Sequence, residues 1–201
     1  MFNTGFAVIT AYLIGSLPTS FIVARTRSID IRKYGSGNVG ATNVLRVIGK
    51  WPALFVLAVD IIKGAFVVTL MSNFFYERGV PFSLYAFNAI LGLSVVSGHV
   101  WSIFLSFKGG KGVATGIGVL AALMPKTTFI GLLVFLIAFM KTRYVSVSSL
   151  FLCVTIPFAA AFTGKNIEYI ILSVTLCIII SYRHKSNLKR LLSGDESKIS
   201  F

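Results

Sequence analysis

Charged side chains are scarce in this 201-residue sequence, and acidic ones are the scarcest. Only 12% of the residues are charged, and 6 Asp and Glu residues stand against 19 Lys and Arg residues. Soluble globular chains average about 25% charged residues. Hydrophobic residues make up 56% of the chain, more than a soluble core of this size could bury. This composition excludes an ordinary soluble domain and indicates a polytopic membrane protein.

Cysteine is nearly absent. Cys153 and Cys177 each lie inside an apolar run, with no CxxC or Cys/His spacing near them, which excludes a disulfide framework and a zinc site. Carboxylates are too few for a clustered metal site, and we expect no metal and no cofactor. The net charge of +13 would by itself suggest a nucleic-acid partner. The basic residues, however, fall in short clusters between apolar runs, so we expect none.

Apolar runs long enough to cross a membrane occur along the whole chain, which we take as one domain over residues 1–201. A crossing needs about 20 helical residues. The runs cover residues 6–24, 51–76, 81–107, 113–140, 144–162 and 167–182. Met124-Pro125-Lys126 interrupts the fourth run, which is therefore either one kinked span or two short helices, near 113–123 and 127–140, that do not cross fully.

Loop charge decides between these two topologies, because cytoplasmic loops are rich in Lys and Arg. With six spans, basic residues divide almost equally between the two sides. With seven, only Arg78, Lys126 and Lys165 remain outside, and Lys63 lies within a span. The charges Arg25 and Arg27 follow the first apolar run, which is typical of a signal-anchor. We therefore predict an all-α integral membrane protein with seven transmembrane helices, two of them short, an outside N-terminus and a cytoplasmic C-terminus.

The first polar segment, residues 28–50, has the composition of an anion site. Its glycines can let consecutive backbone N–H groups converge on an anion. Neutral donors stand beside cations, a combination that suits a phosphate or another oxyanion. A capped turn followed by a helix is the simpler alternative, but the polar density exceeds what a turn needs. The candidate residues are Gly35, Ser36, Gly37, Asn38, Gly40, Thr42 and Asn43, with the cations Arg32, Lys33 and Arg46.

The second segment is the glycine-rich loop Lys108-Gly109-Gly110-Lys111-Gly112, directly before the helix predicted from residue 113. A glycine loop at a helix N-terminus can hold a phosphate, because orphan N–H groups and the helix dipole point at it. The Walker pattern is absent, since no Ser or Thr follows Lys111. His99 precedes the loop, and a hydrogen-bonded packing role is favoured for it over a catalytic one.

Two further polar sets lie elsewhere in the chain. Ser146 and Ser149 share one helix face, as do His184 and Asn187 within the basic stretch 183–190. Such a stretch is also typical of an anchor for anionic lipid. Asp60 and Lys63 lie one turn apart inside the second span, where buried charges are expensive unless paired. We therefore expect an internal ion pair, with a direct role in substrate binding left open.

In these motifs, and nearly from end to end, the chain resembles the bacterial acyl-phosphate:glycerol-3-phosphate acyltransferases of the PlsY type. One departure is Trp101-Ser102 after His99, where relatives usually have a proline near Ser102. The motifs that carry the resemblance are Gly15-Ser16-Leu17-Pro18, Gly35 to Arg46, Asp60-Ile61-Ile62-Lys63-Gly64, Gly98-His99, Phe107 to Thr115, Arg143-Tyr144-Val145-Ser146 and Arg183 to Leu192.

The resemblance implies transfer of a fatty acyl group from acyl phosphate to the 1-hydroxyl of glycerol 3-phosphate, the first step of bacterial phospholipid synthesis. It implies a multi-pass protein of the bacterial cytoplasmic membrane, an active site facing the cytoplasm, and acyl phosphate supplied by an acyl-phosphate synthase. The catalytic residues we expect are Ser36, Arg46, Lys111 and His184. The expected substrate-binding residues are Gly37, Asn38, Thr42, Asn43, Lys108, Gly109, Gly110, Gly112, Ser146 and Asn187.

The residues favour direct attack on the acyl phosphate, because no nucleophile with a positioned base is evident. The departing phosphate or His184 would take the hydroxyl proton. A transporter of a phosphorylated solute would also need cationic pockets, but neither glycine motif has the second copy that inverted repeats would provide. A non-catalytic lipid-binding scaffold would explain residues 183–190 but not Ser36 to Arg46. Both alternatives predict no glycerol-3-phosphate-dependent release of phosphate.

Overall fold

The computed structural model describes residues 2–199, and every regular element in that range is a helix. The all-α prediction is therefore confirmed for these residues, whereas Met1, Ser200 and Phe201 of the domain predicted over 1–201 lie outside them. The chain packs into two compact units, Met1–Val119 and Leu120–Phe201. That these units form a single domain stays a prediction.

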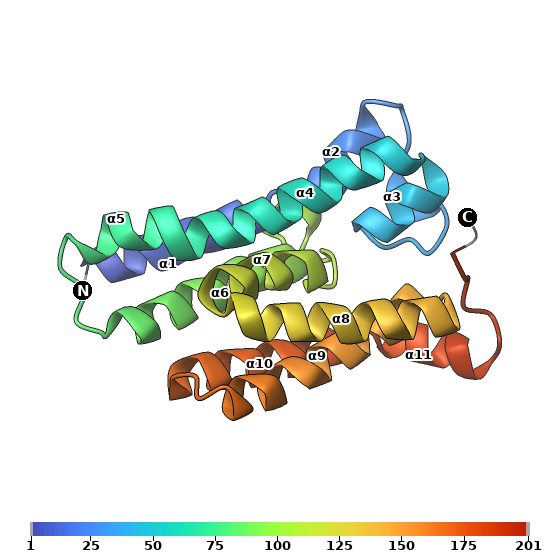
Figure 1. Ribbon diagram of the computed structural model, residues 1–201. Coiled ribbons are helices and arrows are strands. Elements are labelled where there is room, and N and C mark those ends of the chain that lie inside the picture. The colour runs from blue at the N-terminus through green and yellow to red at the C-terminus, as the bar shows by residue number, and fades with distance from the viewer. Residues whose placement is uncertain (1, 200–201) are drawn as a thin grey trace. The chain divides into compact units, whose positions relative to one another are not determined.

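The first unit contains three long helical segments and several short helices that connect them (Figure 1). Three of its elements, α4, η2 and α5, form one continuous helix over Lys50–Tyr76 with a π-helical turn in the middle. The elements are α1 (Phe2–Ser16), α2 (Thr19–Arg25), η1 (Ile31–Lys33), α3 (Ala41–Val47), α4 (Lys50–Phe66), η2 (Val67–Met71), α5 (Ser72–Tyr76), α6 (Leu84–Val100), η3 (Ile103–Leu105) and α7 (Val113–Leu123), which crosses the boundary between the units.

The first apolar run is broken at Leu17-Pro18, between α1 and α2. Proline has no N–H and its ring disfavours a continuous helix, and at the break the carbonyl oxygens of Ser16 and Leu17 have no helical partner four residues further on. The Thr19 N–H donates to the Leu17 carbonyl oxygen at 3.0 Å, and side chains supply further donors. The Ser102 hydroxyl donates to the Ser16 carbonyl oxygen at 2.6 Å, and Lys63 Nζ donates to the Leu17 carbonyl oxygen at 3.3 Å. Ser102 thus helps to hold this break.

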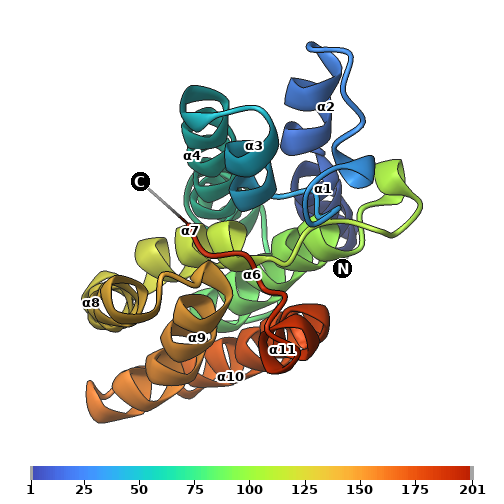
Figure 2. The same ribbon diagram turned by 90° about the vertical axis from the view of Figure 1, so that its right-hand side faces the viewer.

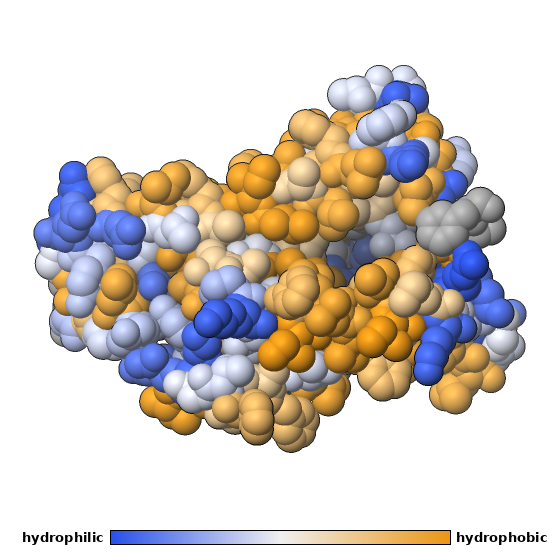
Figure 3. Space-filling view, viewed as in Figure 1, coloured by the Kyte–Doolittle hydropathy of each residue, from blue (hydrophilic) through white to orange (hydrophobic). Residues whose placement is uncertain are grey.

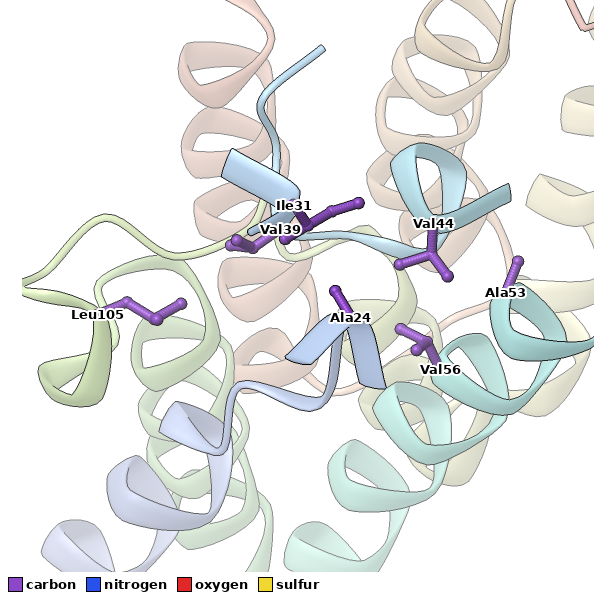
Figure 4. Packing of buried hydrophobic residues seen from close by; sticks show 7 residues of the cluster. All are labelled: Ala24, Ile31, Val39, Val44, Ala53, Val56 and Leu105. Atoms are coloured by element: carbon purple, nitrogen blue, oxygen red, sulfur yellow. The ribbon is translucent and has the colours of Figure 1, made fainter. Parts of the chain in front are cut away.

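A small apolar core supports the glycine-rich segment that follows α2. Its residues come from α2, η1, α3, α4, η3 and the loop before α3, and their side chains are shown in Figure 4. Full burial of a Val, Leu or Ile side chain stabilises a fold by roughly 1.5–3 kcal/mol. The core therefore fixes both ends of residues 32–43. Its members are Ala24, Ile31, Val39, Val44, Ala53, Val56 and Leu105.

The second unit is built on three long helices and one short one: α8 (Pro125–Thr142), α9 (Val145–Phe162), α10 (Ile167–Arg183) and α11 (Lys185–Leu192). Helix α9 packs against both α8 and α10, and Figure 2 shows it between them. The hydroxyls of Thr127 and Thr163 form a hydrogen bond at 3.1 Å, which links α8 to the end of α9.

The predicted break in the fourth apolar run is confirmed at Met124, which separates α7 from α8. The shorter piece also agrees with the expected 113–123. The prediction that residues 127–140 are too short to cross was wrong, because α8 has 18 residues. Its first residue is Pro125, which fits the first helical position since that N–H has no partner there, and its last is Thr142.

Five helical segments in residues 2–199 are long and apolar enough to cross a membrane, and a sixth is added if the bent pair α10 and α11 counts as one span. Large apolar side chains are exposed along them, including Phe158, Phe162 and Ile178. On the face shown in Figure 3, apolar side chains cover the flanks of the helices and hydrophilic ones gather near the helix ends. Both features are typical of helices that face lipid.

Candidate functional site

The glycine-rich segment before α3 is organised by the side chain of Asn43. Its Oδ1 accepts a hydrogen bond from the Ser36 N–H at 2.9 Å, and its Nδ2 donates to the carbonyl oxygens of Ile31 and Tyr34 at 3.1 and 3.0 Å. Gly35 has a φ of +59°, and a Cβ there would lie 2.3 Å from Asn43 Oδ1. Asn43 is buried and uses both N–H groups of its amide inside the loop. It therefore shapes the loop, and its role in substrate binding stays a prediction.

The cations predicted beside this loop are not equivalent. Arg32 Nε and one terminal nitrogen donate to the two carboxylate oxygens of Asp30 at 2.9 and 2.8 Å. The hydrogen bond from Arg32 holds the pKa of Asp30 well below its ordinary value, and Arg25 adds a second positive charge at 3.5 Å. The charge of Arg32 is thus offset by Asp30. Lys33 is exposed, and Arg46 lies half-buried in the last turn of α3.

The remaining candidates of this segment lie next to one another along the chain. Asn38 precedes α3, Thr42 is in its first turn, and both are half-buried. Gly37 is in the left-handed region, with a φ of +68°. Together with Ser36 and Arg46 they stay candidates for an anion site.

The second glycine loop is held against the end of α6. The Gly109 N–H donates to the Val100 carbonyl oxygen at 3.1 Å, and the Gly110 N–H donates to the His99 carbonyl oxygen at 3.0 Å. A Cβ on Gly109 would lie 2.1 Å from the His99 carbonyl oxygen, and one on Gly110 would lie 2.2 Å from His99 Nε2. These two glycines are thus required by the close approach of the protein itself.

The predicted substrate-binding residues of this loop differ in what they offer a ligand. The N–H groups of Gly109 and Gly110 donate within the protein, and a role of these two glycines in substrate binding stays a prediction. The N–H groups of the first turn of α7 have no partner within the helix, and Lys108 is exposed and Lys111 half-buried at its start, with Gly112 buried between loop and helix. Any anion site here would use these groups.

The predicted ion pair inside the second span is confirmed. Lys63 Nζ lies 2.7 Å from Asp60 Oδ1, and both side chains are buried. His99 Nδ1 lies 3.1 Å from Lys63 Nζ and 3.7 Å from Asp60 Oδ1. The hydroxyl of Thr19 donates to Asp60 at 3.5 Å. Sequence reasoning missed the place of His99 in this group, because nothing in a lone histidine on an apolar helix indicates its partners.

A cavity adjoins this polar group in the first unit. The space that no protein atom fills amounts to about 210 Å³, part of it open to solvent. The walls come from the α1–α2 break, the end of α6 and the second glycine loop. Polar lining residues include Thr19, Asp60, His99, Ser102 and Gly110.

In the second unit, Glu196 brings two predicted residues together. Its Oε1 accepts hydrogen bonds from the Ser146 hydroxyl at 2.9 Å and from Asn187 Nδ2 at 2.7 Å, and its Oε2 accepts from Arg190 Nε at 2.9 Å. Burial by itself raises the pKa of Glu196, but the three hydrogen bonds outweigh burial, and the pKa lies below its ordinary value. The sequence carried no signal for this residue, since its partners are 50 and 9 positions away.

His184 is buried where α10 ends, and its Nδ1 lies 2.8 Å from the Ile180 carbonyl oxygen. A carbonyl oxygen only accepts, so Nδ1 carries a proton. In the neutral imidazole, Nε2 is then the acceptor nitrogen. This is the tautomer in which His184 can take up a proton through Nε2.

Within residues 2–199, no group of three or more His, Cys, Asp and Glu side chains lies close enough together to hold a metal ion. Cys153 and Cys177 are free thiols, as expected.

The sequence matches known proteins along nearly its whole length. The sequence profile of the glycerol-3-phosphate acyltransferase family matches residues 5–194. A glycerol-3-phosphate acyltransferase of Prochlorococcus marinus (strain MIT 9301) is 42% identical over 196 residues, 96% of this chain and 96% of the relative. One of Halalkalibacterium halodurans is 42% identical over 197 residues, 96% of this chain and 93% of the relative.

Two crystal structures share the fold. Both are of PlsY, described as an integral membrane glycerol 3-phosphate acyltransferase. The glycerol 3-phosphate form is 34% identical, with a TM-score of 0.89 over 98% of this chain and 96% of that one. The lysophosphatidic acid form is 34% identical, with a TM-score of 0.86 over 98% and 95%. Because the family profile, relatives at 42% identity and crystal structures of the same fold all match almost the entire length, this all-α integral membrane chain belongs to the glycerol-3-phosphate acyltransferase family.

Proposed function

We propose that the protein transfers a fatty acyl group from acyl phosphate to the 1-hydroxyl of sn-glycerol 3-phosphate. The products are 1-acyl-glycerol 3-phosphate, which is lysophosphatidic acid, and inorganic phosphate. The observation that carries the proposal is the full-length match to glycerol-3-phosphate acyltransferases at 42% identity, which includes both basic glycine loops. In the cell, an acyl-phosphate synthase would supply the donor, and membrane lipid would surround the enzyme.

The topology that suits this reaction has seven spans, with the N-terminus outside and the C-terminus in the cytoplasm. Six spans come from the long helical segments, counting α10, and the short α7 adds the seventh. Only Arg78, Lys126 and Lys165 then lie outside the bacterial cytoplasmic membrane, in accord with the positive-inside rule. Both glycine loops and His184 fall on the cytoplasmic side, where soluble glycerol 3-phosphate is available.

The enzyme's main task would be to hold two anions close together. Acyl phosphate is a mixed anhydride with a good leaving group, so positioning and charge compensation supply most of the rate. We assign that compensation to Arg46, Lys108 and Lys111, because Arg32 is already paired with Asp30. Ser36, Asn38 and Thr42 would add neutral donors, and Ser146 and Asn187 stay predicted substrate-binding residues.

The reaction would proceed by direct attack. The 1-hydroxyl oxygen forms a bond to the acyl carbon, the bond from that carbon to the phosphate oxygen breaks, and phosphate leaves with the electron pair. The hydroxyl proton goes to the departing phosphate or to Nε2 of His184, whose Nδ1 is held as N–H by the Ile180 carbonyl oxygen. Neither route needs a covalent acyl-enzyme or a metal ion.

Phosphate release tests the reaction. Purified protein in detergent is given acyl phosphate with and without glycerol 3-phosphate, and both inorganic phosphate and lysophosphatidic acid are measured. We expect equal amounts of the two products, formed only when glycerol 3-phosphate is present. Release of phosphate without the acceptor, or no release at all, would contradict the proposed reaction.

The direct-attack step is tested by trapping. Ser36 carries a hydroxyl between Gly35 and Gly37 of the first glycine loop, and it is therefore the candidate for a covalent intermediate. Wild-type protein incubated with acyl phosphate alone should show no mass increase of one acyl chain, and Ser36→Ala should slow turnover without abolishing it. Activity should also persist in excess chelator. An acyl adduct on Ser36 would refute direct attack, and loss of activity in chelator would refute the metal-free reaction.

A further inference from the structure

Three polar groups surround the ammonium of Lys63 and account for its three N–H bonds. They are Asp60 Oδ1 at 2.7 Å, His99 Nδ1 at 3.1 Å and the Leu17 carbonyl oxygen at 3.3 Å. An ammonium group only donates, so His99 Nδ1 is the acceptor, and the ring proton lies on Nε2. Lys63 therefore fixes both the tautomer and the orientation of the imidazole, whose side chain is only 9% exposed.

The opposite edge of the same ring faces the second glycine loop. A Cβ on Gly110 would lie 2.2 Å from His99 Nε2 and 3.0 and 3.1 Å from the neighbouring ring carbons Cε1 and Cδ2. The main chain of His99 holds the same residue, because its carbonyl oxygen accepts from the Gly110 N–H at 3.0 Å. Gly110 is thus fixed from two directions by one residue.

We propose that His99 is a positioning residue for the glycine loop. Held by Lys63 and Asp60, its imidazole forms the wall against which Gly110 rests, and so sets where Lys108 and Lys111 stand. This inference rests on the proposed function, in which that loop binds the phosphate of glycerol 3-phosphate. His99 would act through the loop and would not contact substrate.

The wall can be removed without disturbing the ion pair. In His99→Asn, the amide oxygen takes the place of Nδ1 as the acceptor for Lys63, while the atoms at Nε2 and Cε1 are lost. Gly110→Ala in the natural background should push the loop away from the ring. In the His99→Asn background, the added Cβ of Gly110→Ala should fit into the space that Nε2 and Cε1 of the ring occupied.

The expected result is a strong coupling between the two positions. Gly110→Ala should raise KM for glycerol 3-phosphate by about tenfold or more, because small displacements of a positioning loop are costly. His99→Asn alone should raise it by roughly fivefold, since the loop loses its support. Adding Gly110→Ala to His99→Asn should cost less than about threefold more, which is a non-additive pair. KM for acyl phosphate should stay within about twofold throughout, whereas a general folding defect would raise both constants.

Gly109 provides the matched control. A Cβ there would meet the His99 carbonyl oxygen at 2.1 Å, and the Val100 carbonyl oxygen at 2.8 Å. These are main-chain atoms, which His99→Asn does not remove. Gly109→Ala should therefore cost the same fold-change in both backgrounds.

Two results would overturn the proposal. The first is that Gly110→Ala raises KM for glycerol 3-phosphate by the same factor in the wild-type and His99→Asn backgrounds. The second is that His99→Asn reduces the effects of Gly109→Ala and Gly110→Ala on this KM equally. If the wild type shows no transfer to glycerol 3-phosphate, the proposed function fails instead. The coupling is then read from the melting temperatures of the same purified variants. The drop caused by Gly110→Ala should shrink in the His99→Asn background while that of Gly109→Ala does not, and equal drops would again overturn the positioning role.

Discussion

Removing the carboxylate of Glu196 should detach the C-terminal tail, residues 193–199, from the helices of the second unit. Glu196→Ala deletes the acceptor for Ser146, Asn187 and Arg190 at 2.9, 2.7 and 2.9 Å. Hydrogen bonds to a charged group are each worth about 1.5–3 kcal/mol. The bond from Arg190 counts for less because that side chain is 33% exposed, so we expect a loss of about 3–5 kcal/mol, as for breaking a buried charge pair.

Two further variants calibrate this number. Glu196→Gln keeps one carbonyl oxygen for Ser146 and Asn187 but turns an N–H toward Arg190, and it should cost roughly 1–3 kcal/mol, the penalty of one mismatched group. Asp195→Asn is the control, because its carboxylate is exposed and bonds the Ser193 hydroxyl at 2.7 Å.

The measurements are the free energy of unfolding in detergent and hydrogen exchange over residues 190–199. Protection of the tail should fall in the order wild type, Glu196→Gln, Glu196→Ala. Activity should follow, because Asn187 loses the acceptor that fixes its amide. The reasoning is wrong if Glu196→Ala and Asp195→Asn give the same stability and the same tail exchange.

Three other outcomes are expected. Arg46→Lys should lower kcat/KM by about 100-fold, since an ammonium cannot reproduce the planar fork of a guanidinium. Steady-state kinetics would measure this loss, with Lys33→Gln as the control because it alters an exposed cation. Near-natural turnover of Arg46→Lys would remove Arg46 from the site. Asp60→Leu alone should cost about 3–5 kcal/mol by leaving a buried ammonium without its carboxylate, and the double variant with Lys63→Met should cost less in the same unfolding assay; an equal or larger loss in the double variant would contradict the ion-pair argument. The pKa of Glu196 is lowered in the folded protein. Its contribution to tail docking should therefore be full above the unfolded pKa of about 4.3 and should be lost as the pH falls through the folded pKa. Limited proteolysis of the tail across this pH range should show the change in wild type, and a similar pH dependence in Glu196→Gln would refute the role of the carboxylate.

Features that depend on neighbouring residues could be predicted from the sequence. The break at Met124 follows from a proline and a lysine inside an apolar run, because proline cannot continue the hydrogen-bonding pattern of the preceding turn. The Asp60–Lys63 pair follows from their spacing, because residues three apart share a helix face and lone charges are costly in a membrane. In each case the physical cause lies within one or two turns of helix.

Features that depend on distant residues could not be predicted in this way. Asn43 offered amide donors to an anion on composition alone, and only the folded loop shows them donated to Ile31 and Tyr34. Gly109 and Gly110 suggested a ligand at close range, whereas the close neighbour is His99. Glu196 follows the last helix in an ordinary polar tail, and its partners are brought to it by the reversal of the chain after α11. Composition indicates which groups are available, but not which of them the protein itself uses.

The break at Leu17-Pro18 has a consequence for the order of assembly during synthesis. The Ser16 carbonyl oxygen receives its hydrogen bond from the hydroxyl of Ser102, 86 residues later. The Leu17 carbonyl oxygen accepts locally from the Thr19 N–H at 3.0 Å, and only its bond from Lys63 comes from a donor 46 residues later. When the first span leaves the ribosome, the donor for Ser16 has not been made, and an unsatisfied carbonyl in hydrocarbon costs several kcal/mol. The first span therefore reaches its final state only after the chain through Ser102 has been translated, and until then water, the insertion machinery or lipid headgroups must satisfy the Ser16 oxygen.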